Sequence, residues 1–227
     1  MDFKYDEDLE QIDKLRQEEI RNRKNKYIER SQLPQRFRNK DIVLIPAKAD
    51  LEAFRKLDEI RNNIKDFILK GQNLYICSNK VGNGKTTCAT KLLIAYIDTF
   101  NESTFYEEKC PALFINVSRF LQERKMAIDN KDQALIEKVQ FIDSNILSAD
   151  LVIFDDIADK KISDYDADLL YYWIDGRTAS MKSCIYTSNL LPEELENNVT
   201  EKLYSRIIGY STIIKFIDGD HRFEVKK

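Results

Sequence analysis

The residues best suited to chemistry lie in the segment NKVGNGKTT, from Asn79 to Thr87, around the triplet Gly84-Lys85-Thr86. Glycine lets backbone N–H groups approach phosphate oxygens, lysine adds a positive charge, and a threonine hydroxyl can ligate Mg²⁺. The pattern G-x-x-x-x-G-K-[ST] that combines these features places its first glycine at position 79, where this chain has asparagine. Because asparagine tolerates the left-handed backbone region, we expect the phosphate-binding turn to survive.

The flanking sequence supplies the elements that position such a loop. Leu74-Tyr75-Ile76-Cys77 has the length and composition of a strand, and a helical pattern runs from Thr87 to Thr99. The helix N-terminus would add partial positive charge. A chance Gly-Lys-Thr in a surface loop is the alternative. The predicted triphosphate contacts are Asn79, Val81, Gly82, Asn83, Gly84, Lys85, Thr86 and Thr87.

A pair of carboxylates follows a second apolar run, since Leu151-Val152-Ile153-Phe154 leads into Asp155 and Asp156. The carboxyl ends of parallel strands form the edge at which α/β proteins bind ligands. We therefore predict that Asp155 holds Mg²⁺ with Thr86, and that Asp156 orients the attacking water. Many ATPases with a phosphate-binding loop of this kind have the longer glutamate in place of Asp156. We therefore expect slow ATP hydrolysis. The alternative is that two acids end this strand by chance.

Two further residues extend the predicted site. Asn189, at the end of the run Ser183 to Asn189, is predicted to contact the γ-phosphate or its water. The alternative is that it caps the following helix. Arg206 lies on a later predicted helix and is predicted to act as an arginine finger toward the ATP of a neighbouring subunit. Its alternative is a surface arginine paired with Glu201 or another acid.

Five apolar runs alternate with amphipathic helices, which predicts a parallel sheet covered by helices on both faces. Gly71 is expected to end the first core helix and Ser163 to cap a later one. The predicted strands are 74–77, 112–117, 149–156, 183–189 and 212–217. The predicted helices are 50–70, 87–99, 118–126, 131–144, 164–174, 192–196 and 200–208.

Composition narrows the class of protein. The chain has 227 residues, 33% charged and 43% hydrophobic, and a formal net charge of −3, so any nucleic-acid contact must be local. An acidic N-terminus without an apolar centre argues against a signal peptide, and no apolar run has transmembrane length. We expect a cytoplasmic protein. The four cysteines form no C-x-x-C pair, which disfavours zinc or disulfides, and Cys77 and Cys184 are predicted to lie in core strands.

The N-terminal region, residues 1–33, is predicted to be a charged helical arm, acidic over residues 1–13 and basic over residues 14–30. Leu9, Ile12, Leu15 and Ile20 recur at roughly helical spacing. The arm is either a solvated helix or a docking element for a protein or nucleic acid. Pro34 and the next four residues are predicted to link it to the domain of residues 34–227.

The segments SNKVGNGKTT, LVIFDDIA, IYTSNLLPEEL and LYSRI, in this order, resemble AAA+ replicative helicase loaders of the DnaC/DnaI type, especially compact phage versions, over roughly residues 34–222. The resemblance implies a five-stranded AAA+ core, ATP and Mg²⁺ at a subunit interface, and a ring or spiral assembly. It also implies a hexameric replicative helicase as the partner of the N-terminal region. By this resemblance Lys85 and Thr86 match the Walker A motif, Asp155 and Asp156 match Walker B, Asn189 matches sensor 1, and Arg206 matches the finger.

The same resemblance implies a grip on single-stranded DNA. Arginine on phosphate and an aromatic ring on a base are suited to that task, although Phe120 can equally be a core residue. Arg177 and Arg222 lie near predicted strand ends and are considered as contacts to nucleotide or a neighbour. The candidate DNA contacts are Arg119, Phe120, Arg124 and Lys125.

We therefore expect an ATP-dependent loader that places a replicative helicase on single-stranded DNA. Two alternatives stay open. One is a transposition helper of the IstB type, which targets duplex DNA and a transposase. The other is an adaptor that binds nucleotide without hydrolysis and occupies or inhibits a replication protein, an alternative that Asn79 and Asp156 keep open.

Overall fold

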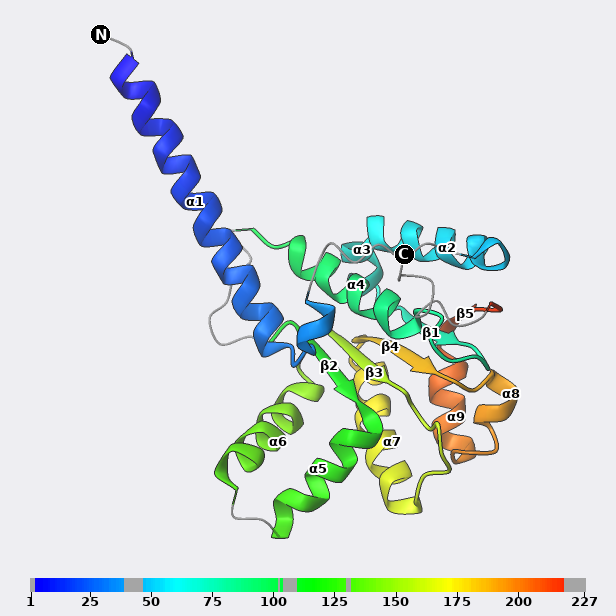
Figure 1. The fold of residues 1–227 in the computed structure, drawn as a ribbon. Coiled ribbons are helices and arrows are strands. Elements are labelled where there is room, and N and C mark those ends of the chain that lie inside the picture. Colours follow the sequence, from blue (N-terminus) through cyan, green and yellow to red (C-terminus); the bar gives the residue numbers. More distant parts are fainter. Residues whose placement is uncertain (1–2, 39–46, 102, 104–109, 130–131, 219–227) are drawn as a thin grey trace, which may run out of the picture.

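The computed structural model describes residues 3–38, 47–101, 103, 110–129 and 132–218. A five-stranded sheet lies between two sets of helices, and one long helix projects from this body (Figure 1). The strands have the order β2-β3-β4-β1-β5, and each neighbouring pair is parallel, as predicted. Their bounds are β1 Asn73–Cys77, β2 Ala112–Asn116, β3 Leu151–Asp155, β4 Ser183–Ser188 and β5 Ser211–Lys215.

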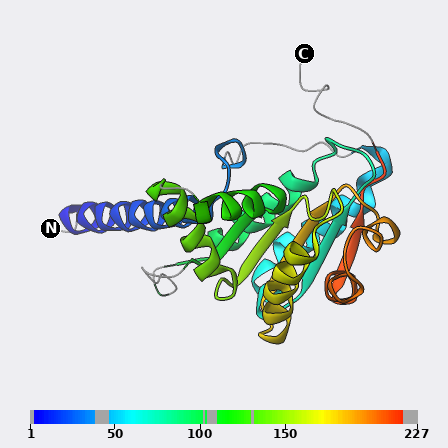
Figure 2. The same ribbon diagram turned by 90° about the horizontal axis from the view of Figure 1, so that it is seen from below.

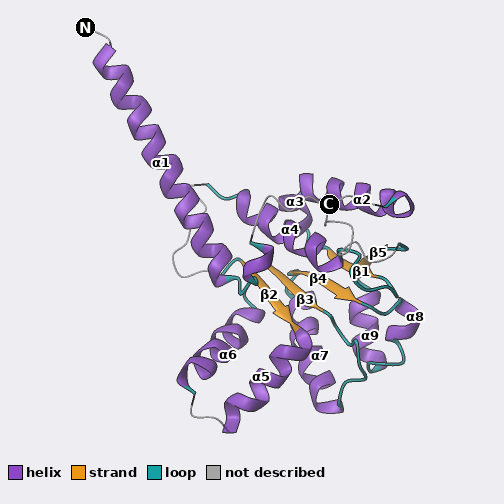
Figure 3. Cartoon of the chain, in the orientation of Figure 1, coloured by secondary structure: helices purple, strands orange, loops and turns teal. Residues whose placement is uncertain are grey.

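The strand side chains divide the core into two hydrophobic clusters, one on each face of the sheet, because successive residues of a strand point to opposite faces. Tyr75 and Phe154 pack with α5, α6, α7 and α9, whereas Ile76 and Ile153 pack with α2, α3 and α4. These two groups of helices lie on opposite sides of the sheet (Figure 3). The helices are α1 Phe3–Arg30, α2 Leu51–Asn62, α3 Ile64–Leu69, α4 Lys85–Asp98, α5 Val117–Asp129, α6 Gln133–Ile146, α7 Asp164–Ala179, α8 Pro192–Leu195 and α9 Glu201–Ile208.

All four cysteines are buried and free, including Cys77 and Cys184 in their predicted strands. Among the described residues, no helix combines the length and apolar composition that crossing a membrane requires.

The predicted helix 50–70 is two helices, because the backbone of Asn63 leaves the helical region at φ −116° and ψ 26°. The side chain of Asn63 donates to the Glu59 carbonyl at 3.0 Å, which satisfies one of the carbonyls at the end of α2. Gly71 ends α3 as predicted, with φ +62°, and a Cβ there would lie 2.7 Å from the Met181 carbonyl oxygen. Ser163 caps α7 as predicted by accepting the Asp166 N–H at 3.2 Å.

The long helix α1 has its C-terminal end in the core of the body, whereas its N-terminal part extends away from it (Figure 2). Tyr27, Ile28 and Leu33 are buried, and the Ser31 carbonyl accepts the Phe114 N–H of the edge strand β2 at 2.7 Å. The short 3-10 helix η1 (Gln35–Phe37) follows. The segment from Tyr27 to Leu33 is therefore part of the body, and only the preceding turns of α1 project as an arm.

Arg177 on α7 is fully buried at the edge of the sheet where β3 and β4 begin. Its guanidinium donates to the backbone carbonyls of Ile146, Ala149, Asp150 and Ser183, and to the Cys184 sulfur. The phosphate-binding loop follows the opposite, carboxyl end of β1. The suggestion that Arg177 contacts nucleotide is therefore wrong, and Arg222, considered with it, lies outside the described residues.

We predict that Arg177→Ala destabilises the protein by more than about 3 kcal/mol, because several buried carbonyls lose their only charged donor. Urea unfolding followed by circular dichroism measures this loss. Arg55→Ala removes an exposed arginine paired with Glu59 on α2 and is the matched control, with an expected cost below about 0.5 kcal/mol. Equal midpoints for the two variants would contradict the assignment of Arg177 as a core residue.

Candidate nucleotide-binding site

The loop between β1 and α4 is held against the end of β4. The Ser78 N–H donates to the Ser188 carbonyl at 3.2 Å. The loop takes the left-handed conformation at Gly82 (φ 78°) and Gly84 (φ 90°), which is where the turn needs glycine. Asn79 is exposed and does not have positive φ. The turn survives as expected, but the reason differs, since no left-handed residue is needed at position 79.

Lys85 is buried at the start of α4, and its ammonium group points back into the loop. Nζ donates to the Lys80 carbonyl at 2.9 Å and to Asn83 Oδ1 at 3.1 Å. Burial lowers the pKa of Lys85, an effect opposed mainly by the negative charges of Asp156 and Asp159. The ammonium group is thus held in the loop by two oxygens that a phosphate can replace.

Asn83 provides an independent indication of an anion site. Its side chain is 1% exposed, and Nδ2 is a buried donor without a partner among the described residues. Leaving such a donor unsatisfied costs about 1–3 kcal/mol. Together with the free N–H groups of the first turn of α4, this donor is suited to phosphate oxygens. The residues present therefore fit a triphosphate.

Asp155, the last residue of β3, is 3% exposed and accepts hydrogen bonds from three elements. The hydroxyls of Thr86 on α4 and Thr187 on β4 both donate to Oδ1 at 2.7 Å. Asn116, opposite Asp155 in the register of β2 and β3, donates to Oδ2 at 3.3 Å. The structure therefore brings Thr86 and Asp155, the two predicted Mg²⁺ residues, into direct contact.

Asp156 follows in the left-handed conformation, with φ 53°. The Asn116 Nδ2 donates to its carboxylate at 3.2 Å, and its backbone N–H donates to the Thr187 hydroxyl at 3.0 Å. Burial, and then the charges of Asp155 and Asp159, raise the pKa of Asp156 to about 6, against the opposing effects of Lys85 and Asn116. A carboxylate in this environment is suited to accept a proton from water.

Asn189 lies just beyond β4, but its side chain is engaged by an acid. Its Nδ2 and its backbone N–H both donate to the carboxylate of Asp159. Thr187, two residues earlier, is the residue of this strand that contacts Asp155 and Asp156. The predicted role of Asn189 toward phosphate or water remains a prediction.

Arg206 on α9 forms an ion pair with Asp175 on α7 at 2.5 Å, and about a third of its side chain is exposed. Its guanidinium also lies over the Tyr210 ring, 5.7 Å from the centroid. The alternative of pairing with an acid is therefore correct for the single chain. The pair lies on the surface, where a neighbouring molecule can reach it.

The candidate DNA contacts on α5 are mostly engaged within the body. Phe120 is buried against Trp173, with ring centroids 5.8 Å apart, so its prediction as a stacking surface is wrong and the core alternative is correct. Arg124 pairs with Asp143 at 3.1 Å and Lys125 with Asp166 at 2.7 Å, which joins α5 to α6 and α7. Arg119 and Lys125 are the exposed members, and Arg119 pairs with Glu123 within its own helix.

Sequence reasoning missed three site residues, namely Asn116, Thr187 and Asp159. The signal for the first two was available, because each is a polar residue at the carboxyl end of a predicted strand that neighbours β3. Asp159 carried no such signal. Its position depends on the path of the chain after β3, which passes through a second left-handed residue at Ala158.

The strand order, the phosphate-binding loop after β1 and the acidic end of β3 define the AAA+ P-loop ATPase fold. No protein-family profile matches the sequence, and no curated protein matches it significantly.

Solved structures show which proteins share this fold. A crystal structure of the DnaC helicase loader matches with a TM-score of 0.60 and 18% identity, over 81% of this chain and 99% of that chain. A putative primosome component from Streptococcus pyogenes matches with a TM-score of 0.62 and 17% identity, over 86% and 97%. The replication initiator DnaA bound to AMPPCP and single-stranded DNA matches with a TM-score of 0.58 and 16% identity, over 80% of this chain and 50% of that chain. The structures that share this fold thus include a DnaC helicase loader, a putative primosome component and the replication initiator DnaA.

We predict that Asp156→Asn stabilises the nucleotide-free protein at neutral pH. Because the pKa in the folded protein is about 6 and the ordinary value is 3.8, folding favours the neutral carboxyl. That contribution to stability is fully present below the unfolded pKa and is lost as pH rises through about 6. The variant stays neutral, so its Tm advantage should be near zero at pH 4 and at least about 2 °C above pH 7.

Thermal unfolding of both proteins across this pH range measures the difference. Asp168→Asn, an exposed change on α7, is the control and should leave the profile unchanged. A Tm difference for Asp156→Asn that does not vary with pH would contradict the interpretation.

Proposed function

We propose that the protein is an ATP-dependent loader that binds a replicative DNA helicase and helps to place it on single-stranded DNA. The observation that carries this proposal is the contact of Thr86 with Asp155 beside the buried Lys85, within a fold that matches a helicase loader over nearly all of that loader's length. The first part of the proposal is ATP hydrolysis, and the second is the helicase partner.

Each residue of the site has a task in ATP hydrolysis. Lys85 and the loop N–H groups hold the β- and γ-phosphates, while Thr86 and Asp155 hold Mg²⁺ directly or through water. Bound Mg²⁺ supplies charge neutralisation at the phosphates. No cluster of three or more His, Cys, Asp or Glu side chains suited to a metal exists in the described part of the chain, and Thr86 and Asp155 are the residues that would hold the ion. Asp156 orients the attacking water and accepts its proton.

Arg206 is proposed to act on the ATP of a neighbouring copy. No contact joins Arg206 to the loop of its own chain within the described residues; its partners are Asp175 and Tyr210. A guanidinium that leaves Asp175 for a triphosphate exchanges one charged acceptor for another. The ATPase would then depend on assembly into a ring or spiral.

We predict that Arg206→Ala leaves ATP binding intact and lowers hydrolysis in the assembled protein by on the order of 10³-fold. Asp175→Ala is the matched control, because it breaks the same ion pair while keeping the arginine. Lys85→Ala, which should abolish ATP binding, is the negative control. Binding is measured with a fluorescent ATP analogue and hydrolysis by phosphate release, with helicase and single-stranded DNA added.

ATP hydrolysis by Arg206→Ala at the rate of the unaltered protein would contradict the assignment of Arg206 as an arginine finger. Equal losses in Arg206→Ala and Asp175→Ala would show that the pair is structural. Bound ATP without hydrolysis under any condition would instead support the nucleotide-bound adaptor.

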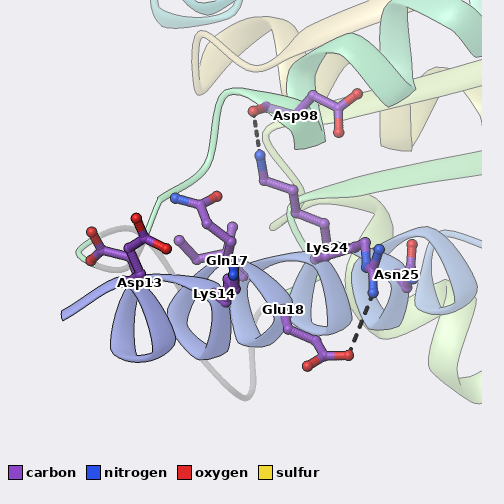
Figure 4. Close-up of a pocket in the computed structure, with 10 residues that line it drawn as sticks. Asp13, Lys14, Gln17, Glu18, Lys24, Asn25 and Asp98 are labelled. Carbon is purple, nitrogen blue, oxygen red and sulfur yellow. Dashed lines mark hydrogen bonds and ion pairs between the residues drawn. The ribbon is translucent and has the colours of Figure 1, made fainter. Parts of the chain in front are cut away.

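The projecting arm is the proposed contact for the helicase. Its inner face meets the body along a polar groove, where Lys24 Nζ donates to the Asp98 carbonyl at 2.7 Å (Figure 4). Ile12 and Leu15 do not line this groove and are 47% and 61% exposed. They are one helical turn apart, so they present adjacent apolar side chains to a partner.

We predict that Leu15→Asp weakens binding to a candidate hexameric replicative helicase by at least about tenfold, because a buried apolar contact becomes a buried charge. Gln17→Asp, on the groove side of the same helix, is the matched control. Co-purification and fluorescence anisotropy measure binding, and circular dichroism verifies the helix. If both variants bind like the unaltered protein, the arm does not contact the helicase. Capture of a transposase in its place would favour the transposition helper.

Single-stranded DNA is the proposed nucleic-acid substrate, supported by the fold shared with DnaA bound to single-stranded DNA. With Phe120 in the core and Arg124 largely covered in its pair with Asp143, Arg119 and Lys125 are the exposed candidates on α5.

A further inference from the structure

Asp159 is an acid of the site that the proposed mechanism has not used. Its Oδ1 accepts the backbone N–H of Asn189 at 3.2 Å, and its Oδ2 accepts the side-chain Nδ2 of the same residue. One carboxylate therefore accepts hydrogen bonds from both the backbone N–H and the side-chain NH₂ of the residue predicted to contact the γ-phosphate or its water.

The position of Asp159 is set by the end of β4. The Ile157 N–H donates to the Thr187 carbonyl, and the Ser188 hydroxyl donates to the Ile157 carbonyl, both at 2.9 Å. The Asn198 side chain donates to the Ala158 carbonyl, also at 2.9 Å. The chain after β3 is thus held by the end of β4 at Ile157 and by Asn198 at Ala158, and the next residue, Asp159, contacts Asn189.

The chemistry of the pair fixes the orientation of the Asn189 amide. An ionised carboxylate only accepts hydrogen bonds, so the NH₂ end of the amide must face Asp159. The carbonyl oxygen, Oδ1, accepts no hydrogen bond from the described residues and is therefore available to a further donor. An acceptor oxygen repels a phosphate oxygen, whereas it accepts a hydrogen from water.

The negative charge of Asp159 also indicates a role other than phosphate binding. The carboxylate of Asp159 is close enough to act electrostatically on both Lys85 and Asp156. It therefore adds negative charge beside the position of the triphosphate, which disfavours binding. Because Asp159 weakens phosphate binding, its presence in the site is best explained by a role in a step other than binding.

We propose that Asp159 is a positioning residue that turns the Asn189 amide so that its oxygen orients the attacking water and its NH₂ group is kept from the γ-phosphate. This inference rests on the proposed ATPase function. Without Asp159, the amide can rotate and donate to the γ-phosphate. ATP then gains a charge-assisted hydrogen bond that ADP cannot form, while the water loses its acceptor.

The test compares ATP and ADP affinities, and the rate of a single turnover, in the full chain with Mg²⁺ and fluorescent analogues of both nucleotides. Asp159→Ala should raise the preference for ATP over ADP by on the order of tenfold and lower the single-turnover rate by a similar factor. In the Asn189→Ala background, the same change should not alter the preference, because no amide remains to rotate.

Two further variants separate charge from orientation. Asp159→Asn removes the charge but keeps an acceptor for Asn189, so it should tighten both nucleotides alike and retain most of the rate. Asp168→Ala removes an exposed acid of α7 and should change neither measurement.

If the unaltered protein binds neither nucleotide, the proposed function fails. If it binds and hydrolyses ATP, but Asp159→Ala leaves the ATP preference unchanged or changes it equally with and without Asn189, the ATPase stands and the role of Asp159 is overturned.

Discussion

The buried carboxylate of Asp155 is the constraint on which the site depends. A charge with so little exposure is tolerated only where donors surround it. Here the donors come from α4, β4 and β2, through Thr86, Thr187 and Asn116. Meeting this requirement aligns the carboxyl ends of three strands with the first turn of the helix after the phosphate-binding loop. The same contacts that satisfy one acid therefore assemble the site.

The charges around Asp155 are unbalanced. Asp155, Asp156 and Asp159 lie near one another, and Lys85 is the cation whose field reaches Asp156. Each acid is bonded to neutral donors: two hydroxyls and the amides of Asn116 and Asn189. Such a site is suited to a triphosphate that arrives with a divalent cation, because the cation supplies the positive charge that the chain lacks. Its excess of negative charge also explains why a finger from another copy would be useful at the transition state.

The two ends of α1 have different surroundings. The C-terminal turn of α1 is fixed in the core by Tyr27 and Ile28, while the preceding turns expose Ile12 and Leu15. A partner bound at the exposed turns would act through a continuous helix on the edge strand β2, whose Phe114 N–H is bonded to the Ser31 carbonyl. Strand β2 ends at Asn116, which contacts both Asp155 and Asp156. The arm is thus connected to the site by a short series of backbone elements.

The fold class and the main motifs could be predicted from the amino-acid sequence. Alternation of apolar runs and amphipathic helices specified five parallel strands, and Gly84-Lys85-Thr86 and Asp155-Asp156 marked the candidate site, because these features depend on local composition and spacing. The surroundings of each side chain, in contrast, depend on how the elements pack. It buried Phe120 and Arg177, paired Arg206 with Asp175, and turned Asn189 toward Asp159. The partner of a polar side chain can come from an element distant in sequence, such as Thr187 for Asp155 or Ile146 for Arg177. Spacing along the chain carries no information on such contacts.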